Sequence, residues 1–157
     1  MFVVGDKVLY PMHGAGIIDR IEEKEVMGER QDYYVVALPF GDLSVSVPVC
    51  KRVDVGLRPV IAAEKARAVL DAFGQTTIDE SSNWNKRYRE NMLRIRSGDI
   101  CEVSDVLFSL MKRDQDRGLS TGERKMMVSA KMIFVSEISL SVGCPRDEVE
   151  ATIAGVF

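Results

Sequence analysis

The sequence is poor in the residues from which catalytic and metal sites are built. It has one histidine, one tryptophan and three cysteines among 157 residues. His13 has no Asp or Cys at ligand spacing and no Ser or Cys partner beside it, so we predict neither a metal site nor a nucleophile–base pair there. Gly14 and Gly16 follow, but the lysine and the Ser or Thr of a phosphate-binding loop are missing. We therefore expect a non-enzymatic protein without a cofactor or metal.

Long apolar runs are missing as well. No stretch approaches the roughly 20 apolar residues of a membrane-spanning helix, and residues 1–6 lack the features of a signal peptide. The cysteines are odd in number and widely separated, at Cys50, Cys101 and Cys144. That spacing is typical of free thiols in a reducing compartment rather than of disulfides or a zinc site. We expect a cytoplasmic, monomeric protein that does not associate with a membrane.

The excess of one charge is also small, since the net charge is -3. Its distribution is more informative than its sum. Residues 1–83 carry 9 Lys and Arg against 13 Asp and Glu, whereas residues 84–137 carry 11 against 8. The sign therefore changes at Trp84, the single tryptophan. This asymmetry predicts two surfaces with different partners.

The first half of the chain predicts short strands joined by tight turns. The expected strands cover residues 5–10, 17–21, 22–26, 33–38 and 43–48, with turns at 27–31 and 39–42. In the last strand Leu43, Val45 and Val47 are expected to face inward. Ser44 and Ser46 alternate with them and are expected to face solvent. The connections are too short for helices, so the sheet should be antiparallel and form a small barrel of the SH3 or Tudor type.

The second half predicts a helical bundle after a linker over residues 53–59. Asn83 is a predicted N-cap for a helix from Trp84 to Arg96, and Ser120 with Glu123 forms a capping box before a long helix. The other expected helices cover residues 61–73, 101–116 and 145–156, and the long helix ends near Leu140. The expected fold class is α+β, with an antiparallel β-barrel domain over residues 1–55 and an all-helical domain over residues 56–157.

Trp84 begins its predicted helix beside three cations. Lys86, Arg87 and Arg89 follow within five residues. This pattern fits a nucleic-acid contact in which cations hold phosphates and the ring meets an unstacked base step. Packing in the core is the other interpretation, because tryptophan is highly buried on average. A second basic cluster, over residues 112–125, is interleaved with acids and is expected to be an ordinary solvated face, which leaves Arg87 and Arg89 as the freer cations.

Three separated blocks carry a resemblance to a known family. They are Gly5–Gly16 (GDKVLYPMHGAG), Asn83–Tyr88 (NWNKRY) and Arg113–Ser120 (RDQDRGLS), the last followed by Gly122 and Glu123. In these blocks, and in their order and spacing, the sequence resembles the CarD/CdnL family of bacterial transcription regulators. The resemblance implies that a Tudor-like domain docks on the β subunit of RNA polymerase. It also implies that the helical domain contacts promoter DNA at the upstream edge of the transcription bubble.

The resemblance assigns roles to particular residues of the helical domain. Trp84 is implied to wedge into the minor groove and hinder collapse of the bubble, thereby stabilising the open promoter complex. Lys86, Arg87 and Arg89 are implied to contact phosphates. No residue that would recognise base edges is evident, so we expect the DNA contact to be weak and without direct sequence readout.

For polymerase binding, the resemblance points to Lys24 and Ser46. Some members of the family carry arginine at both positions. Lys24 keeps the positive charge without the bidentate fork of arginine, and Ser46 has no charge. An alternative stays open at this point: the chain is a polymerase-binding adaptor, similar to the module of transcription-repair coupling factors. In that alternative the Tudor-like domain acts alone and the helices bind a protein partner.

Overall fold

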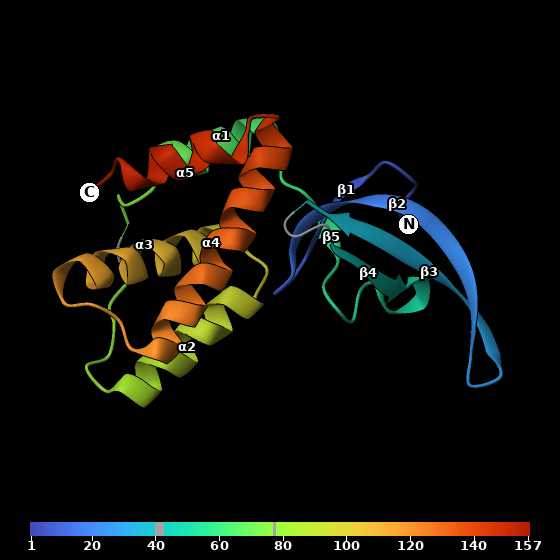
Figure 1. Cartoon of the computed structure of the whole chain (residues 1–157), viewed down its shortest axis with the longest axis horizontal. Helices are drawn as coiled ribbons and strands as arrows, with labels where there is room; N and C mark the ends of the chain where they lie inside the picture. Colours follow the sequence, from blue (N-terminus) through green and yellow to red (C-terminus); the bar gives the residue numbers. More distant parts are fainter. Residues whose placement is uncertain (40–42, 77) are drawn as a thin grey trace.

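The computed structural model describes residues 1–39, 43–76 and 78–157 and divides into a sheet and a helical bundle (Figure 1). The strands are β1 (Lys7–Tyr10), β2 (Gly14–Val26), β3 (Glu29–Leu38), β4 (Leu43–Pro48) and β5 (Arg58–Pro59), with a short 3-10 helix at Val49–Lys51. They form one antiparallel sheet in the order β4-β3-β2-β1-β5. The expected α+β class is confirmed.

The small antiparallel barrel expected from the sequence is present as a five-stranded antiparallel sheet, but this sheet is not closed. Among the described residues β4 pairs only with β3 and β5 only with β1, so the two edges do not meet. β5, the edge strand beside β1, has only two residues. It nevertheless forms within the expected linker, where Arg58 pairs with Leu9. The sheet therefore extends beyond the boundary expected after residue 55.

β2 and β3 form a long, curved ribbon that projects beyond the other strands (Figure 1). Met27 and Gly28 alone make its turn, between paired Val26 and Glu29. Both turn residues have positive φ, 53° and 82°, as a tight hairpin turn requires. The two strands expected over residues 17–26 are thus one strand. The turn expected over residues 27–31 has only two residues.

One face of the sheet carries its own small core. Val8, Ile18, Tyr34 and Val36 are buried there, with Val47 of β4 against them. On β4 the expected alternation holds only in part. The predicted inward orientation of Leu43 is wrong, since this residue is 61% exposed. Ser44 and Ser46 are exposed as expected, and the turn expected at residues 39–42 lies mostly outside the described residues.

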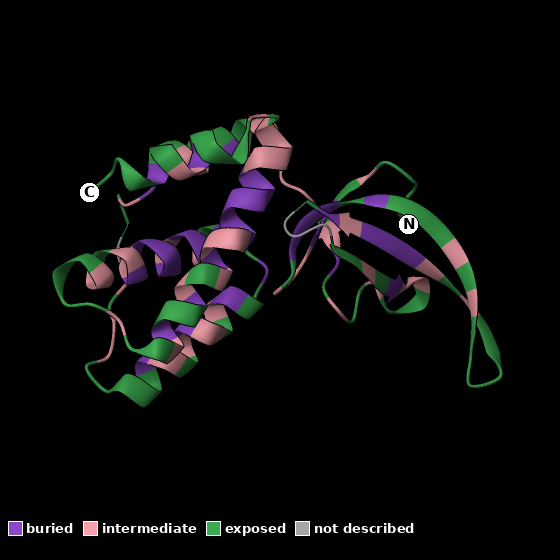
Figure 2. Cartoon of the chain, in the orientation of Figure 1, coloured by how far each residue is buried: buried purple, intermediate pink, exposed green. Residues whose placement is uncertain are grey.

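Five helices follow the sheet, and all five expected helices are confirmed. They are α1 (Ala63–Asp71), α2 (Trp84–Arg96), α3 (Ile100–Asp116), α4 (Thr121–Val142) and α5 (Arg146–Ala154). α4 is the central element and is buried along most of its second half (Figure 2). Leu9 and Ala15 of the sheet belong to the same apolar cluster as Phe134 of α4. The two halves of the molecule therefore share a core.

Two kinds of feature are missing from the described residues. None of their helices has both the length and the apolar character needed to cross a membrane. Nowhere in the described ranges do three His, Cys, Asp or Glu side chains gather into a group that could hold a metal ion.

Candidate nucleic-acid interface

Trp84 occupies the first helical position of α2. Asn83 has an extended backbone and its side chain accepts a hydrogen bond from the Lys86 amide at 3.0 Å, which confirms the predicted N-cap. The cap fixes where the helix begins and therefore the direction of the Trp84 side chain. Trp84 is 41% exposed. The interpretation of this residue as part of the core is therefore wrong.

The exposed indole is nevertheless held on one side. Its ring stacks on Tyr88, one turn further along α2, with centroids 5.0 Å apart and planes at 20°. Its Nε1 donates to Ser120 Oγ at 3.2 Å and to Glu123 Oε1 at 3.1 Å. A Cβ atom at Gly122 would lie 3.6 Å from the indole, so the start of α4 passes directly beneath the ring. Trp84 is thus oriented before any partner binds.

Glu123 supports Trp84 from within the bundle. Ser120 Oγ accepts from the Glu123 amide at 3.2 Å, as the predicted capping box requires. The Glu123 carboxylate is buried and accepts from the indole of Trp84 and from Nε of Arg87. Burial alone raises the pKa of Glu123, but the hydrogen bond and charge of Arg87, with the hydrogen bonds from Trp84 and Ser120, lower this pKa overall. Glu123 is therefore a buried anion that accepts the indole hydrogen bond.

Arg87 is not the free cation that the sequence suggested. Its side chain is 9% exposed and lies between two carboxylates, with Nε 3.2 Å from Glu123 and 3.7 Å from Glu80. It also donates to the carbonyl of Ser81 at 3.2 Å. Arg87 is three residues after Trp84 and so lies on the same side of α2, where α4 covers it. The predicted phosphate contact by Arg87 is therefore corrected. The side chain is enclosed between two carboxylates, so it holds Glu123, which accepts from the indole, and is not available to a phosphate.

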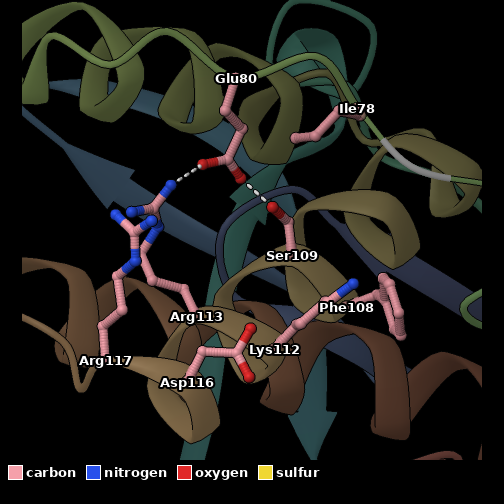
Figure 3. A pocket seen from close by; sticks show the side chains of 8 residues that line it. All are labelled: Ile78, Glu80, Phe108, Ser109, Lys112, Arg113, Asp116 and Arg117. Atoms are coloured by element: carbon pink, nitrogen blue, oxygen red, sulfur yellow. Dashed lines mark hydrogen bonds and ion pairs between the residues drawn. The ribbon is translucent and has the colours of Figure 1, made fainter.

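Glu80 extends this network to α3. Its carboxylate accepts from Arg113 at 2.8 Å and from the hydroxyl of Ser109 (Figure 3). Glu80 is itself 10% exposed and belongs to the segment that leads into α2. The segment before Trp84 is thereby tied to α3, just as the ring of Trp84 is tied to α4.

A pocket of about 380 Å³ lies beside this network. Arg113 lines it together with Lys112 and Arg117 of the same helix region, and Phe108 forms an apolar wall (Figure 3). Lys112 and Arg117 are exposed and make no ion pair with any described residue. The pocket surface is therefore more basic than acidic, next to the residues that hold Trp84.

Lys86 and Arg89 are the exposed cations in the first two turns of α2, near Trp84. Lys86 lies 3.9 Å from Glu90, an exposed pair of little strength. Arg89 is exposed and makes no ion pair within the described part of the chain. Arg124 and Lys125, in the first two turns of α4, are also exposed. These two belong to the cluster that the sequence predicts to be an ordinary solvated face, and they directly follow Glu123, which accepts from the indole.

The two residues expected to bind polymerase lie together on the sheet. Lys24 of β2 donates from Nζ to Ser46 Oγ of β4 at 3.1 Å, across the intervening β3. The same ammonium group lies 5.5 Å from the ring centroid of Tyr33 and 3.6 Å from Glu22. The pKa of Glu22 is lowered, chiefly by its hydrogen bond from Arg20. Lys24 and Ser46 thus mark a single exposed, polar surface, here called the sheet surface.

Comparison with known proteins identifies the family of both halves of the chain. Residues 68–154 match the family model described as CarD, C-terminal domain, and residues 2–61 match the CarD-like/TRCF RID domain, an RNA polymerase-interacting type of domain. The chain belongs to the CarD family. It is 33% identical over 151 residues to the "Putative transcription factor YdeB" of Bacillus subtilis (strain 168), covering 96% of this chain and 99% of that protein. CarD proteins are transcription regulators and not enzymes, which agrees with the resemblance seen in the sequence.

In this CarD-family chain, sequence reasoning missed the residues that support Trp84. Glu80 stands in a polar stretch that predicts only a loop, and its burial depends on arginines 7 and 33 residues away. The sequence predicts Glu123 as a helix cap and as one of the acids interleaved with the second basic cluster. The spacing of a capping box identified its backbone contact but gave no sign that its carboxylate would meet Trp84.

Proposed function

We propose that this protein docks on the β subunit of RNA polymerase through the sheet surface and stabilises the open promoter complex with Trp84. In this proposal the indole enters the minor groove at the upstream edge of the bubble and hinders collapse. Lys86 and Arg89 contact the flanking phosphates. Arg87 is not one of the phosphate contacts. It binds Glu123, which accepts the hydrogen bond from the indole.

The exposure and fixed orientation of Trp84 are the observations that carry the proposal. An aromatic side chain that is 41% exposed normally loses conformational freedom when it stacks on a base. Here Tyr88 and the hydrogen bonds to Ser120 and Glu123 already restrict the ring. The cost of ordering the side chain has thus been met before binding, as in other preorganised sites.

The charge around Trp84 supports weak DNA binding that is independent of sequence. Two exposed cations in the first turns of α2 and two in those of α4 give few phosphate contacts, so binding by the isolated protein should be weak and salt-sensitive. Docking on polymerase raises the effective concentration of Trp84 at the bubble. Each of the two contacts is then sufficient without being tight by itself.

The test compares Trp84→Ala with Leu93→Ala in an open-complex lifetime assay. Leu93 is the matched control, because it is also an exposed apolar residue of α2, at 61%. Loss of stacking is worth about 1–3 kcal/mol, or about one to two decades in lifetime. We expect Trp84→Ala to shorten the lifetime by that factor, and Leu93→Ala to leave it near the wild-type value.

Polymerase binding is measured for the same variants. It should be unchanged in both, because neither residue lies on the sheet surface. A normal lifetime with Trp84→Ala would refute the wedge and favour the adaptor alternative, in which the helices bind a protein. Failure of the bundle to crosslink to promoter DNA within the polymerase complex would lead to the same conclusion.

A further inference from the structure

One ion pair between described residues joins the sheet to the bundle, with its carboxylate fully buried and its guanidinium 28% exposed. Glu137 of α4 is 0% exposed, and both of its carboxylate oxygens accept from Arg58 of β5, at 2.6 and 2.7 Å. Its Oε2 also accepts from the Ile61 amide at 3.0 Å. This bidentate geometry fixes the angle between the partners as well as their distance. None of these contacts involves Tyr88, Ser120 or Glu123, the residues that hold the indole of Trp84.

Arg58 also reaches the far end of the helix that Trp84 begins. Its Nε and a terminal nitrogen donate to the carbonyl of Gly98, at 2.9 and 2.7 Å, just beyond the last turn of α2. One arginine of the sheet therefore holds α2 through Gly98 and α4 through Glu137. These are the two helices whose other ends hold the indole.

The two helices act as rigid arms from Arg58 to Trp84. α2 has 13 residues, and Glu123 and Glu137 are 14 residues apart on α4. At 1.5 Å per residue each arm is about 20 Å long. A tilt of about 5° at Arg58 would displace the indole by about 2 Å over that length, which is a large part of the spacing between stacked rings.

Other contacts at the same junction are close-fitting. The Ala15 amide donates to the buried Ser136 Oγ at 2.9 Å, and Lys7 Nζ donates to the Leu140 carbonyl at 3.0 Å. Gly14 has φ +99°, and a Cβ there would lie 2.9 Å from Met132 Sδ. The turn between β1 and β2 thus lies against α4 with no room for a side chain.

We propose that Arg58 and Glu137 are positioning residues that fix the sheet and the bundle as one rigid unit. The place at which the sheet docks then determines where Trp84 meets the DNA. The inference rests on the proposed function. A fixed separation between the sheet surface and Trp84 matters only if one contacts polymerase while the other contacts DNA.

The first arm of the test measures geometry without polymerase. Cys50 beside β4 and Cys101 on α3 are exposed and lie in different halves, so they accept spin labels once Cys144 is replaced by Ser. We expect a narrow distance distribution in this background. Glu137→Gln keeps the size of the side chain but loses its charge, and Arg58→Lys keeps the charge but loses the fork. Both are expected to broaden the distribution.

A matched control separates position from stability. Asp114→Asn removes an ion pair with Arg124, at 3.4 Å, that lies on the surface of the bundle and does not involve the sheet. This variant should leave the distance distribution narrow. Thermal melting is recorded for every variant. A lower melting temperature with an unchanged distribution in both junction variants would overturn the proposal, because the pair would then only stabilise the fold.

The second arm measures open-complex lifetime at saturating protein. We expect Glu137→Gln to shorten it by about tenfold, because a loose joint lowers the effective concentration of Trp84 at the bubble, while affinity for polymerase stays unchanged. If Trp84→Ala shortens the lifetime and Glu137→Gln does not, the positioning role alone is overturned. If Trp84→Ala has no effect, the proposed function fails, and the positioning role fails with it.

Discussion

The two candidate contact surfaces differ in how their charged groups are held. Around Trp84, the charges that support the indole are enclosed: the side chains of Arg87 and Glu123 are 9% and 5% exposed. On the sheet surface, Lys24 and Glu22 are 42% and 32% exposed. A buried pair is costly to break and holds one geometry, whereas an exposed pair contributes little and rearranges freely. The Trp84 surface is thus preorganised, and the sheet surface is left to adapt to its partner.

The same difference divides neighbouring residues within α2. Successive helical residues point about 100° apart, so cations close in sequence face different environments. Arg87 faces the core, while Lys86 and Arg89 face solvent. One short basic segment therefore supplies both the support of the indole and the contacts beside it.

The largest expected effect is on stability, from Arg87→Met. Removing Arg87 leaves Glu123 and Glu80 as buried carboxylates without their shared cation, which should cost about 3–5 kcal/mol. In a chain of this size that loss corresponds to a melting temperature lower by roughly 6–20 °C. Arg89→Met is the control and should change stability by no more than about 0.5 kcal/mol. Equal melting temperatures for the two variants would show that the enclosed Arg87 stabilises the bundle no more than an exposed cation does.

The second prediction concerns pH and Glu123. The folded-state pKa of Glu123 lies below its ordinary value of 4.5, so its stabilisation is complete above that value and is lost as the pH falls through the folded pKa. Glu123→Gln lacks this contribution. The difference in free energy of unfolding between the wild type and this variant should be constant above about pH 5 and shrink at lower pH.

Urea titrations from neutral to acidic pH measure that difference. Glu22→Gln on the sheet is the control, because Glu22 is exposed and solvent screens its charge. Its difference from the wild type should stay small at every pH. A difference for Glu123→Gln that does not change on acidification would show that the charged form of Glu123 is not what stabilises the bundle.

Local signals in the sequence were sufficient for much of this fold. Asn83 and Ser120 are helix caps, and caps depend on residues within one turn, so the bounds of α2 and the start of α4 could be predicted. The position of Trp84 at the start of α2 followed from the same signals, whereas its exposure did not, because the residues alone also allowed packing in the core. The open sheet could not be predicted, because closure depends on whether β4 and β5 meet, and no local pattern records that distance.

The error at Arg87 has a specific cause. Sequence reasoning judged each cation by acids close in the chain, and only Glu90 was nearby. The partners of Arg87 are Glu80 and Glu123, the latter 36 residues away on another helix. Only tertiary packing brings them together, so charge spacing within α2 carried no information about it.

The third prediction separates contact from support in DNA binding. Arg89→Met removes one exposed cation. The fall of log affinity with log salt concentration should therefore become less steep by about one unit. Arg87→Met should leave that slope near the wild-type value at a temperature where the variant is folded. Binding of the purified protein to a premelted promoter fragment, followed at several salt concentrations, measures both slopes. A reduced slope for Arg87→Met with an unchanged slope for Arg89→Met would reverse the assignment of the two arginines.

The smallest effects are expected on the sheet surface, from Ser46→Ala. The hydroxyl accepts from Lys24 at 3.1 Å in an exposed position, so its loss should change stability by no more than about 0.5 kcal/mol. If the sheet surface adapts to its partner, Lys24 reaches polymerase without help from Ser46, and Ser46→Ala should bind core polymerase as the wild type does. Lys24→Met should bind several-fold more weakly, because the charge itself is lost. An equal loss in Ser46→Ala would mean that the hydrogen bond prepositions Lys24, and the sheet surface would then be preorganised in the same way as the surface around Trp84.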